Sequence, residues 1–392
     1  MSKLEECILG DLVEFQRGYD LPKSKFVEGK YPVQSSNGIL GYHNEYKVEG
    51  PGITIGRSGT VGTPHLIREN FFPHNTSLFV KEFKGNDIEY IYYLLQYLDL
   101  GNQKSGSGVP TMNRNHLHPI KIRAYRDKTY QQRTIKILSL IDKKIQINNQ
   151  INQELEAMAK TLYDYWFVQF DFPDQNGKPY KSSGGKMVYH PELKREIPEG
   201  WGVAKVEDIA QTGSGGTPKS TNVSYYSNGE IPWINSGELE QTVITSTSNF
   251  ITEEGLNNSS AKLFPSGTIL VAMYGATAGK VSFLTFEAST NQAICAIMLN
   301  DIRMRYYLKN VIEDLYQYLV KLSTGSARDN LSQDMIKNIK VVIPSNDILD
   351  RYYDFSNNII KEITKKQQEN EQLTQLRDWL LPMLMNGQVK VE

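Results

Sequence analysis

Short runs of β-branched and aromatic residues alternate along the chain with longer stretches in which apolar residues recur every three or four positions. The short runs are bounded by Gly, Pro and Asn, which is typical of β-strands. They lie at 52–55, 77–80, 120–122, 268–273, 293–299 and 339–343. The stretches at 88–98 and 304–322 have the spacing of amphipathic helices. The chain is therefore predicted to mix helix and sheet.

Two longer stretches carry apolar residues at alternating steps of three and four, which is the spacing of a heptad seam. The first is a helix predicted over 131–164, and the second lies within 345–392. Asn152 and Asn370 fall at equivalent inward positions of the two seams. A buried Asn weakens packing but fixes the register of paired helices. Since each helix needs an apolar partner, we expect the two to pair as an antiparallel coiled coil.

The second half of the chain repeats the first. Segments 21–24 and 217–220 share Pro-Lys-Ser, Asn75 is matched to Asn291, and the loop at 106–108 is matched to 325–327. The offset between matched residues rises steadily, as expected for two copies of one domain when the second has gained insertions. We therefore predict an α+β fold. It has two tandem-repeated globular domains, separated by the two long helices and related by approximate two-fold symmetry.

The expected boundaries follow from this repeat. A first globular domain covers 1–130 and is followed by a central helix in 131–170, a linker over 171–200, a second globular domain over 201–344 and a C-terminal helix in 345–392. The linker is rich in Pro and Gly, which predicts ordered but irregular structure.

Composition narrows the class of protein. The 392 residues carry a formal net charge of −1, which argues against a polybasic carrier. Cys7 and Cys295 stand far apart, so neither a disulfide framework nor a zinc ribbon is expected. The sequence has neither a secretory pattern at its start nor an apolar run approaching the roughly 18 residues of a membrane span. We expect a cytoplasmic protein.

Motifs for catalysis are absent from the sequence. Without a Pro-Pro pair, the chain lacks the Asn/Asp-Pro-Pro-aromatic signature of amino-methyltransferases. The glycine turn at 275–281 departs from a phosphate-binding loop, because Val281 stands where Ser or Thr would hold magnesium. We predict no catalytic residue and no metal site. A standalone nuclease using Asp174, Glu192 and Lys194 is one alternative, although we expect no strand in the linker to present these carboxylates.

Positive charge is concentrated between Gly101 and Arg133, where seven basic residues accompany one acidic residue, Asp127. This strip surrounds a glycine-rich loop, and Asn and Arg side chains can read the edges of adenine and guanine. A solvated basic face is the alternative. The residues that we expect to contact DNA are Arg57, Lys104, Asn113, Arg114, Lys219, Tyr274, Lys280 and Arg328.

The order of these features, found twice, resembles the specificity subunit of type I restriction-modification systems. The matching segments are 231–234 before a Ser-Gly turn, 267–271, the loop at 325–326 before 339–344, and 380–387. The resemblance implies a non-catalytic subunit of a bacterial defence enzyme that methylates and cuts DNA. Each globular domain would read one half of a bipartite double-stranded target. Base-reading residues do not transfer between the copies, since the first has Val33 where the second has Trp233.

The resemblance also implies partners. Two methyltransferase subunits would dock on the helices and bind S-adenosylmethionine, while restriction and translocase subunits would join through them and use ATP and magnesium. No cofactor is expected in this chain. A helix over 131–164 is about 50 Å long, which predicts half-sites roughly ten to fifteen base pairs apart. If the chain is instead a coiled-coil scaffold without sequence-specific DNA binding, Arg114→Ala and Arg328→Ala will leave DNA affinity unchanged.

Overall fold

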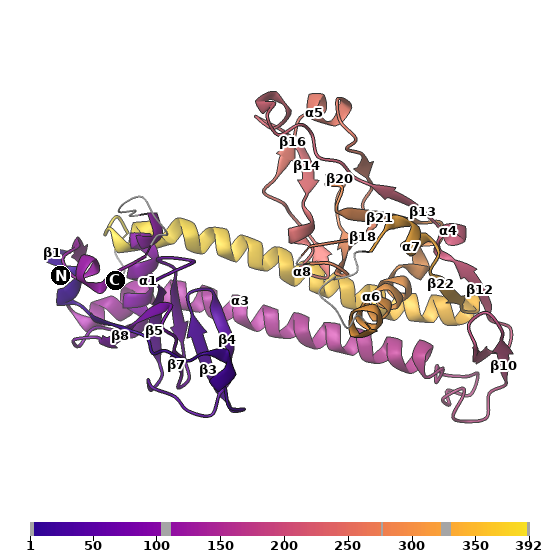
Figure 1. Cartoon of the computed structure of the whole chain (residues 1–392), viewed down its shortest axis with the longest axis horizontal. Helices are drawn as coiled ribbons and strands as arrows, with labels where there is room; N and C mark the ends of the chain where they lie inside the picture. The colour runs from indigo at the N-terminus through magenta and orange to yellow at the C-terminus, as the bar shows by residue number, and fades with distance from the viewer. Residues whose placement is uncertain (1–3, 103–110, 276, 323–330, 390–392) are drawn as a thin grey trace. The chain divides into compact units, whose positions relative to one another are not determined.

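The computed structural model divides the chain into two compact units (Figure 1). Unit 1 consists of Met1–Gln146 with Glu371–Glu392, and unit 2 consists of Ile147–Asn370. Each unit therefore holds one globular copy and a segment of both long helices. The residues that the structure describes are 4–102, 111–275, 277–322 and 331–389.

Unit 1 is built on short strands. In chain order they are β1 (Glu5–Ile8), β2 (Glu14–Arg17), β3 (Tyr31–Ser35), β4 (Gly38–His43), β5 (Gly52–Gly56), β6 (Pro64–Ile67), β7 (Phe72–Pro73), β8 (Ser77–Glu82) and β9 (Lys121–Ala124). They pair in the orders β1-β9, β2-β8-β5-β6 and β4-β3-β7. The helical elements are 3-10 turns at Leu9–Asp11, Lys23–Lys25 and Leu100–Asn102, helices α1 (Ile88–Leu98) and α2 (Arg114–Leu117), the first part of α3 (Lys128–Tyr163) and the last part of α8 (Asn346–Met385).

The core of unit 1 lies between its central sheet, α1 and the two long helices. Asp87 is the N-cap of α1, and its carboxylate accepts a hydrogen bond from the Tyr90 amide at 3.1 Å. Its apolar face is buried, with Tyr90 and Leu94 fully inaccessible to solvent. Leu138 of α3 and Leu384 of α8 join the same cluster. The apolar spacing at 88–98 therefore forms the predicted helix, because one of its faces completes the core.

Unit 2 has a larger set of strands. They are β10 (Met187–His190), β11 (Arg195–Pro198), β12 (Gly202–Lys205), β13 (Ala210–Ser214), β14 (Ile231–Ile234), β15 (Val243–Ile244), β16 (Phe250–Ile251), β17 (Leu263–Phe264), β18 (Ile269–Ala272), β19 (Val281–Leu284), β20 (Ala288–Thr290), β21 (Ile294–Leu299) and β22 (Lys340–Ile343). Its helical elements, apart from its segments of α3 and α8, are α4 (Val206–Ile209), α5 (Glu253–Asn257), α6 (Arg305–Leu322), α7 (Gln333–Lys337), a π-helix at Asp164–Val168 and 3-10 turns at Val223–Tyr225, Ser236–Glu238 and Ile302–Met304.

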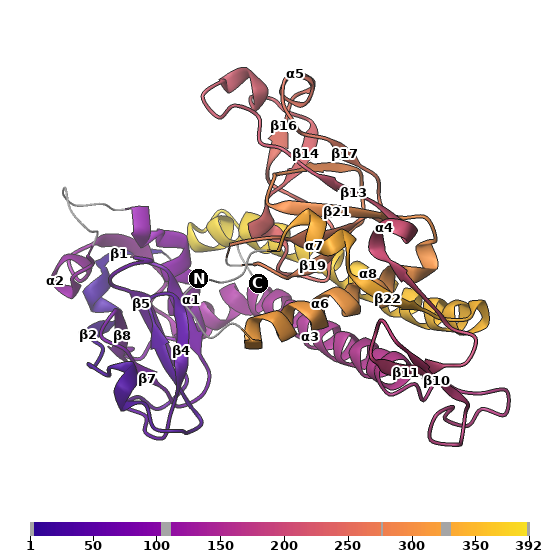
Figure 2. The same ribbon diagram turned by 45° about the vertical axis from the view of Figure 1, so that its right-hand side comes forward.

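The strands of unit 2 pair in the orders β10-β11, β12-β22, β13-β21-β18-β19-β15 and β16-β14-β20-β17. Strand β18 is buried along its whole length, which explains its continuous run of apolar residues. The sheet that contains β14 lies farther from α8 than the sheet that contains β18 (Figure 2).

The segment after α3 is more regular than its sequence suggests. Phe172 stacks on Trp201 with ring centroids 4.9 Å apart, which attaches this segment to unit 2. Strands β10 and β11 pair antiparallel, so the prediction of a linker without strands is wrong. The hairpin escapes prediction because its strands are largely exposed and need no apolar alternation.

Unit 2 repeats the strand pairing of unit 1. The order β13-β21-β18-β19 repeats β2-β8-β5-β6, and the antiparallel pair β12-β22 repeats β1-β9. The parallel pair β14-β20 repeats β3-β7. Backbone hydrogen bonds match as well: the Tyr19 amide donates to the Pro73 carbonyl, the Gly216 amide donates to the Thr290 carbonyl, and both distances are 2.8 Å. The predicted α+β fold with tandem copies is confirmed.

This register corrects two matches made from the sequence. Because Tyr19 corresponds to Gly216, Asp20 corresponds to Thr217, whereas the sequence match placed Leu21 there. Two residues separate Tyr19 from Pro22 in unit 1, whereas one residue separates Gly216 from Pro218 in unit 2. Aligning the two prolines therefore shifts the loop by one position.

The second correction concerns Asn75. The Ser77 amide donates to the His74 carbonyl in unit 1, and the Ile294 amide donates to the Asn291 carbonyl in unit 2. His74 therefore corresponds to Asn291, and Asn75 corresponds to Gln292. Identity between the two asparagines had suggested the shifted match.

The long helices run antiparallel within each unit. In unit 1, Asp142 of α3 accepts a hydrogen bond from Arg377 of α8 at 3.0 Å, and the earlier Leu138 lies in one cluster with the later Leu384. Helix α3 begins at Lys128, three residues before the predicted start, and α8 ends at Met385. None of the described helices is long and apolar enough to cross a membrane.

The same direction holds in unit 2, where Asn148 of α3 meets Asn370 of α8 and Tyr163 lies in one cluster with Tyr352. Asn370 is buried, as the predicted seam requires, and its partner Asn148 is fully buried. Asn152 is half-buried, and no described residue forms a hydrogen bond with its buried Oδ1.

Candidate functional site

Four loops of unit 1 meet at one end of the sheet β2-β8-β5-β6. The Arg57 amide donates to the Thr76 carbonyl, and the Met112 amide donates to the Arg57 carbonyl, both at 2.8 Å. Backbone hydrogen bonds thus fix the loops to one another whatever side chains they carry. We call them the unit 1 loop cluster, consisting of 17–20, 57–60, 74–76 and 111–114.

An open cavity of about 540 Å³ lies in this cluster. Three residues predicted to contact DNA line it, namely Arg57, Asn113 and Arg114, together with Arg17 and Asp20. Asn113 is the N-cap of α2, and Arg114 is exposed on the first turn of that helix. Three guanidinium groups beside one carboxylate make the cavity positive, which suits a polyanion.

Two histidines of unit 1, His74 and His118, each use a ring nitrogen in a hydrogen bond. The Nδ1 of His74 lies 3.0 Å from the Thr76 hydroxyl, and burial lowers the pKa of His74. The Nε2 of His118 accepts a hydrogen bond from the Phe15 amide at 3.0 Å, and burial also lowers the pKa of His118. Among the described residues, no group of three His, Cys, Asp or Glu side chains is placed to hold a metal ion.

Unit 2 builds the same cluster with different side chains. The Met273 amide donates to the Ala293 carbonyl, and the Leu331 amide donates to the Met273 carbonyl, both at 2.8 Å. Buried Met273 therefore takes the place of Arg57. Tyr274 is exposed in the next position, and Lys219 is exposed in the loop after β13. The unit 2 loop cluster consists of 214–217, 273–275, 290–293 and 331–333.

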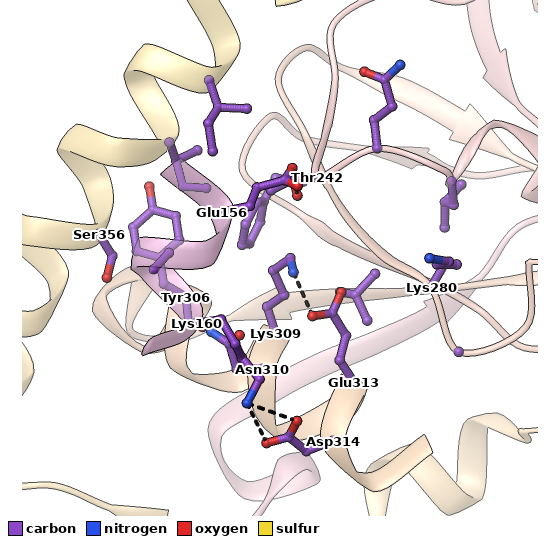
Figure 3. Close-up of a pocket in the computed structure, with 18 of the residues that line it drawn as sticks. Glu156, Lys160, Thr242, Lys280, Tyr306, Lys309, Asn310, Glu313, Asp314 and Ser356 are labelled. Carbon is purple, nitrogen blue, oxygen red and sulfur yellow. Dashed lines mark hydrogen bonds and ion pairs between the residues drawn. The ribbon is translucent and has the colours of Figure 1, made fainter. Parts of the chain in front are cut away.

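Lys280 lies on a different cavity, of about 420 Å³, bordered by α3, α6, α8 and the turn before β19 (Figure 3). Lys309 pairs with Glu313 at 2.7 Å, and Lys160 pairs with Asp314 at 3.3 Å. The cavity carboxylates on α6 thus already have lysine partners, and exposed Lys280 stands across the cavity from Ser356 (Figure 3). Lys280 is therefore separate from the unit 2 loop cluster.

Two predicted contacts, Lys104 and Arg328, lie outside the described residues, as do the loops at 106–108 and 325–327. The structure thus brings Arg57, Asn113 and Arg114 together.

A family model described as the type I restriction modification DNA specificity domain matches residues 1–157 and 198–375. The chain belongs to this family. It is the specificity subunit of a type I restriction-modification system and is non-catalytic, as the sequence predicted. The two matched segments correspond to the two copies of the repeat.

Relatives agree with this assignment. The chain is 27% identical over 313 residues to the type I restriction enzyme MjaIX specificity subunit of Methanocaldococcus jannaschii, covering 78% of this chain and 69% of that protein. It is 28% identical over 315 residues to the HindI specificity subunit of Haemophilus influenzae, covering 67% and 68%. The crystal structure of a type I restriction-modification system S subunit from M. genitalium shares the fold, with a TM-score of 0.55 at 16% identity over 98% of this chain and 96% of that one.

The residues of the nuclease alternative have structural roles in this specificity subunit. Asp174 accepts hydrogen bonds from the amides of Asn176 and Lys178, both at 2.8 Å, which closes a turn. Glu192 pairs with Lys340 at 3.0 Å, and this exposed ion pair lowers the pKa of Glu192. The carboxylates are thus used locally and do not face a shared site.

One feature of the loop clusters is missing from the sequence prediction. The side chains of Asp20 and Asn75 are hydrogen-bonded in unit 1, and those of Thr217 and Gln292 are hydrogen-bonded in unit 2. The available signal was a polar residue close after a glycine in each copy of the first loop: Asp20 is the second residue after Gly18, and Thr217 directly follows Gly216. Their partners come from a distant loop, which only the strand register brings close.

Proposed function

We propose that each unit of this specificity subunit reads one half of a bipartite DNA target. The main support is that one loop cluster is built twice on one backbone register with different side chains: Arg57 lines the cavity in unit 1, whereas its counterpart Met273 is buried in unit 2 and the next residue, Tyr274, is exposed. A constant scaffold with different side chains suits two half-sites of different sequence.

In unit 1, the cavity lined by Arg57, Asn113 and Arg114 is the proposed contact surface. Arginine binds phosphates and reads guanine, whereas asparagine reads adenine, so the cavity carries both kinds of contact. In unit 2 the proposed contacts are Lys219 and Tyr274 near the unit 2 loop cluster, with Lys280 on the separate cavity that α6 borders. Lys104 and Arg328 complete the proposed set from loops outside the described residues.

The long helices offer surfaces for partner subunits. In unit 1, Leu140 and Trp379 are each 58% exposed, and in unit 2 Met158 and Phe355 are 51% and 44% exposed. Large apolar side chains exposed outside the core are typical of protein interfaces. Since both units carry them, we propose that one modification subunit docks on each unit, and that restriction subunits join through the modification subunits.

The chemistry then belongs to the partners. We propose that the modification subunits bind S-adenosylmethionine and flip the target base, and that the restriction subunits use ATP and magnesium. This chain selects the site without holding a cofactor.

Sequencing of methylated DNA tests the proposal. The chain is reconstituted with its modification subunits, supplied with S-adenosylmethionine and given genomic DNA. We expect methylation at a split motif, and we expect Arg57→Ala to relax the base requirement in one half only. A contiguous motif, or a change in both halves, would contradict the proposal. Purified chain with magnesium alone should leave DNA uncut.

A further inference from the structure

Each loop cluster holds one exposed pair of side chains at the same place in the repeat. In unit 1 the side-chain amide of Asn75 donates to Oδ1 of Asp20. In unit 2 the Thr217 hydroxyl donates to Oε1 of Gln292 at 2.5 Å. The backbone register makes Asp20 the counterpart of Thr217 and Asn75 the counterpart of Gln292. Both copies therefore place a hydrogen-bonded pair at the same position, but the side chains that form the pair differ.

Both pairs face solvent and contribute little to the core. The side chain of Asp20 is 71% exposed and lines the cavity with Arg57 and Arg114. Thr217 and Gln292 are both exposed. An exposed hydrogen bond adds little to folding stability, so stability alone gives small reason to place a polar pair at this point in both copies.

The carboxylate of Asp20 is the informative group. Beside DNA it repels phosphates, so among arginines it opposes non-specific binding. It is suited to accept a hydrogen bond from the exocyclic amino group of cytosine. Asn75 and Arg17 bind Oδ1, the latter at 3.5 Å, and neither of these two contacts uses Oδ2. Glutamine, in contrast, pairs with N6 and N7 of adenine.

We propose that Asp20 and Gln292 are base-reading residues, one in each half-site. Asp20 accepts from N4 of a cytosine in the half read by unit 1, and Gln292 pairs with an adenine in the half read by unit 2. Asn75 and Thr217 orient them through the observed hydrogen bonds. This inference rests on the proposed function and adds the identity of one base pair in each half.

The test uses the intact chain with its modification subunits and a plasmid library in which both half-sites are randomised. Methylated molecules are sequenced. We expect Asp20→Asn to lower discrimination for cytosine at one position of one half about tenfold, because one base contact is worth about 1–3 kcal/mol. Gln292→Glu should shift one position of the other half from adenine toward cytosine. The charge-matched controls Glu45→Gln and Gln211→Glu, at exposed positions outside the clusters, should leave the motif unchanged.

A second measurement needs no variant. Uracil in place of the cytosine presents a carbonyl where the amino group was, so wild-type methylation of that site should fall at least tenfold. Unchanged base preferences in both variants, with methylation lowered at all sites alike, would overturn the inference and leave the pairs only a loop-holding role. If the wild-type complex shows no split motif, the proposed function itself fails, whatever the variants do.

Discussion

The side-chain amide of Asn148 donates to Oδ1 of Asn370 at 2.9 Å and joins α3 to α8 where both side chains are buried. Asn370 in turn donates to Oδ1 of Asn149 at 2.8 Å, and Asn148 also reaches Glu369 at 3.0 Å. A one-turn slip of either helix would leave these groups without partners in an apolar seam. This asparagine layer, formed by Asn148, Asn149, Glu369 and Asn370, therefore favours a single alignment of α3 with α8.

Removing the Asn370 side chain from this layer should destabilise the folded protein. We expect Asn370→Ala to lower the free energy of unfolding by about 1–3 kcal/mol, because the buried amide of Asn148 loses one of its two acceptors and keeps only Glu369. The double variant Asn148→Leu with Asn370→Leu should lose less than the sum of the single losses. Asn152→Ala, which removes a buried oxygen that makes no described hydrogen bond, should cost less than Asn370→Ala. Urea denaturation measures all of these, and equal losses for Asn152→Ala and Asn370→Ala would contradict the role of the layer.

The cavity of unit 1 should contribute to DNA affinity. We expect Arg114→Ala to weaken DNA binding by the complex with modification subunits about tenfold and, if the contact is to phosphate, to reduce the salt dependence of binding by about one charge. Lys143→Ala, which removes an exposed positive charge on α3 outside both the cavity and the basic strip at 101–133, is the control and should change neither. Fluorescence anisotropy over a range of salt concentrations measures both quantities. Equal affinities for wild type and Arg114→Ala would favour a scaffold role.

Trp379 should be a main contact for a modification subunit. Truncating an exposed tryptophan in an interface typically costs more than 1 kcal/mol of binding, so Trp379→Ala should weaken subunit association about tenfold or more. Tyr189→Ala is the matched control, because Tyr189 is 60% exposed on the β10-β11 hairpin. Sedimentation of the chain with its partner reports the affinity. Equal losses in both variants would place the interface elsewhere.

A charged network at the start of α8 predicts acid sensitivity of unit 2. Arg303 binds Asp301 and also pairs with Asp350 at 2.7 Å. Hydrogen bonds from Arg303 lower the pKa of Asp301, so folding gains stability above the ordinary carboxyl pKa of about 4 and loses it as pH falls through the lowered value. Asp301→Asn should reduce the stability at neutral pH and make the stability depend less on pH in the acid range. The urea midpoints of the wild type and of Asp301→Asn are compared between pH 2 and 7. The same pH dependence in both proteins would contradict this role of Asp301.

The sequence predicted the helices and strands in which buried positions produce a regular spacing of apolar residues. Helix α1 matches the expected range 88–98, and α6 and β22 each begin within one residue of their predicted starts. The β10-β11 hairpin was missed, because exposed strands carry no apolar pattern. The seams of the long helices were predicted from their spacing, whereas the partnership of Asn148 with Asn370 depends on how two distant helices align.

The candidate site was predictable only in part. Arg57 and Arg114 were singled out from turn chemistry and local charge, and the structure places them in one cavity. Asp20 and Asn75 were missed, because strand register brings their loops together and a one-residue shift in the sequence match hid their counterparts. Side-chain pairs between loops depend on long-range pairing, which local spacing does not encode.

The spacing between the half-sites tests the role of the units and helices most directly. Four residues inserted between Asn149 and Gln150 in α3, with four between Gln368 and Glu369 in α8, leave the asparagine layer intact and lengthen both helices by about 6 Å. Since one base pair rises about 3.4 Å, methylome sequencing should show the same two half-sites separated by about two more base pairs. Unchanged spacing with both half-sites retained would contradict the proposal that the helices set the distance between two reading units.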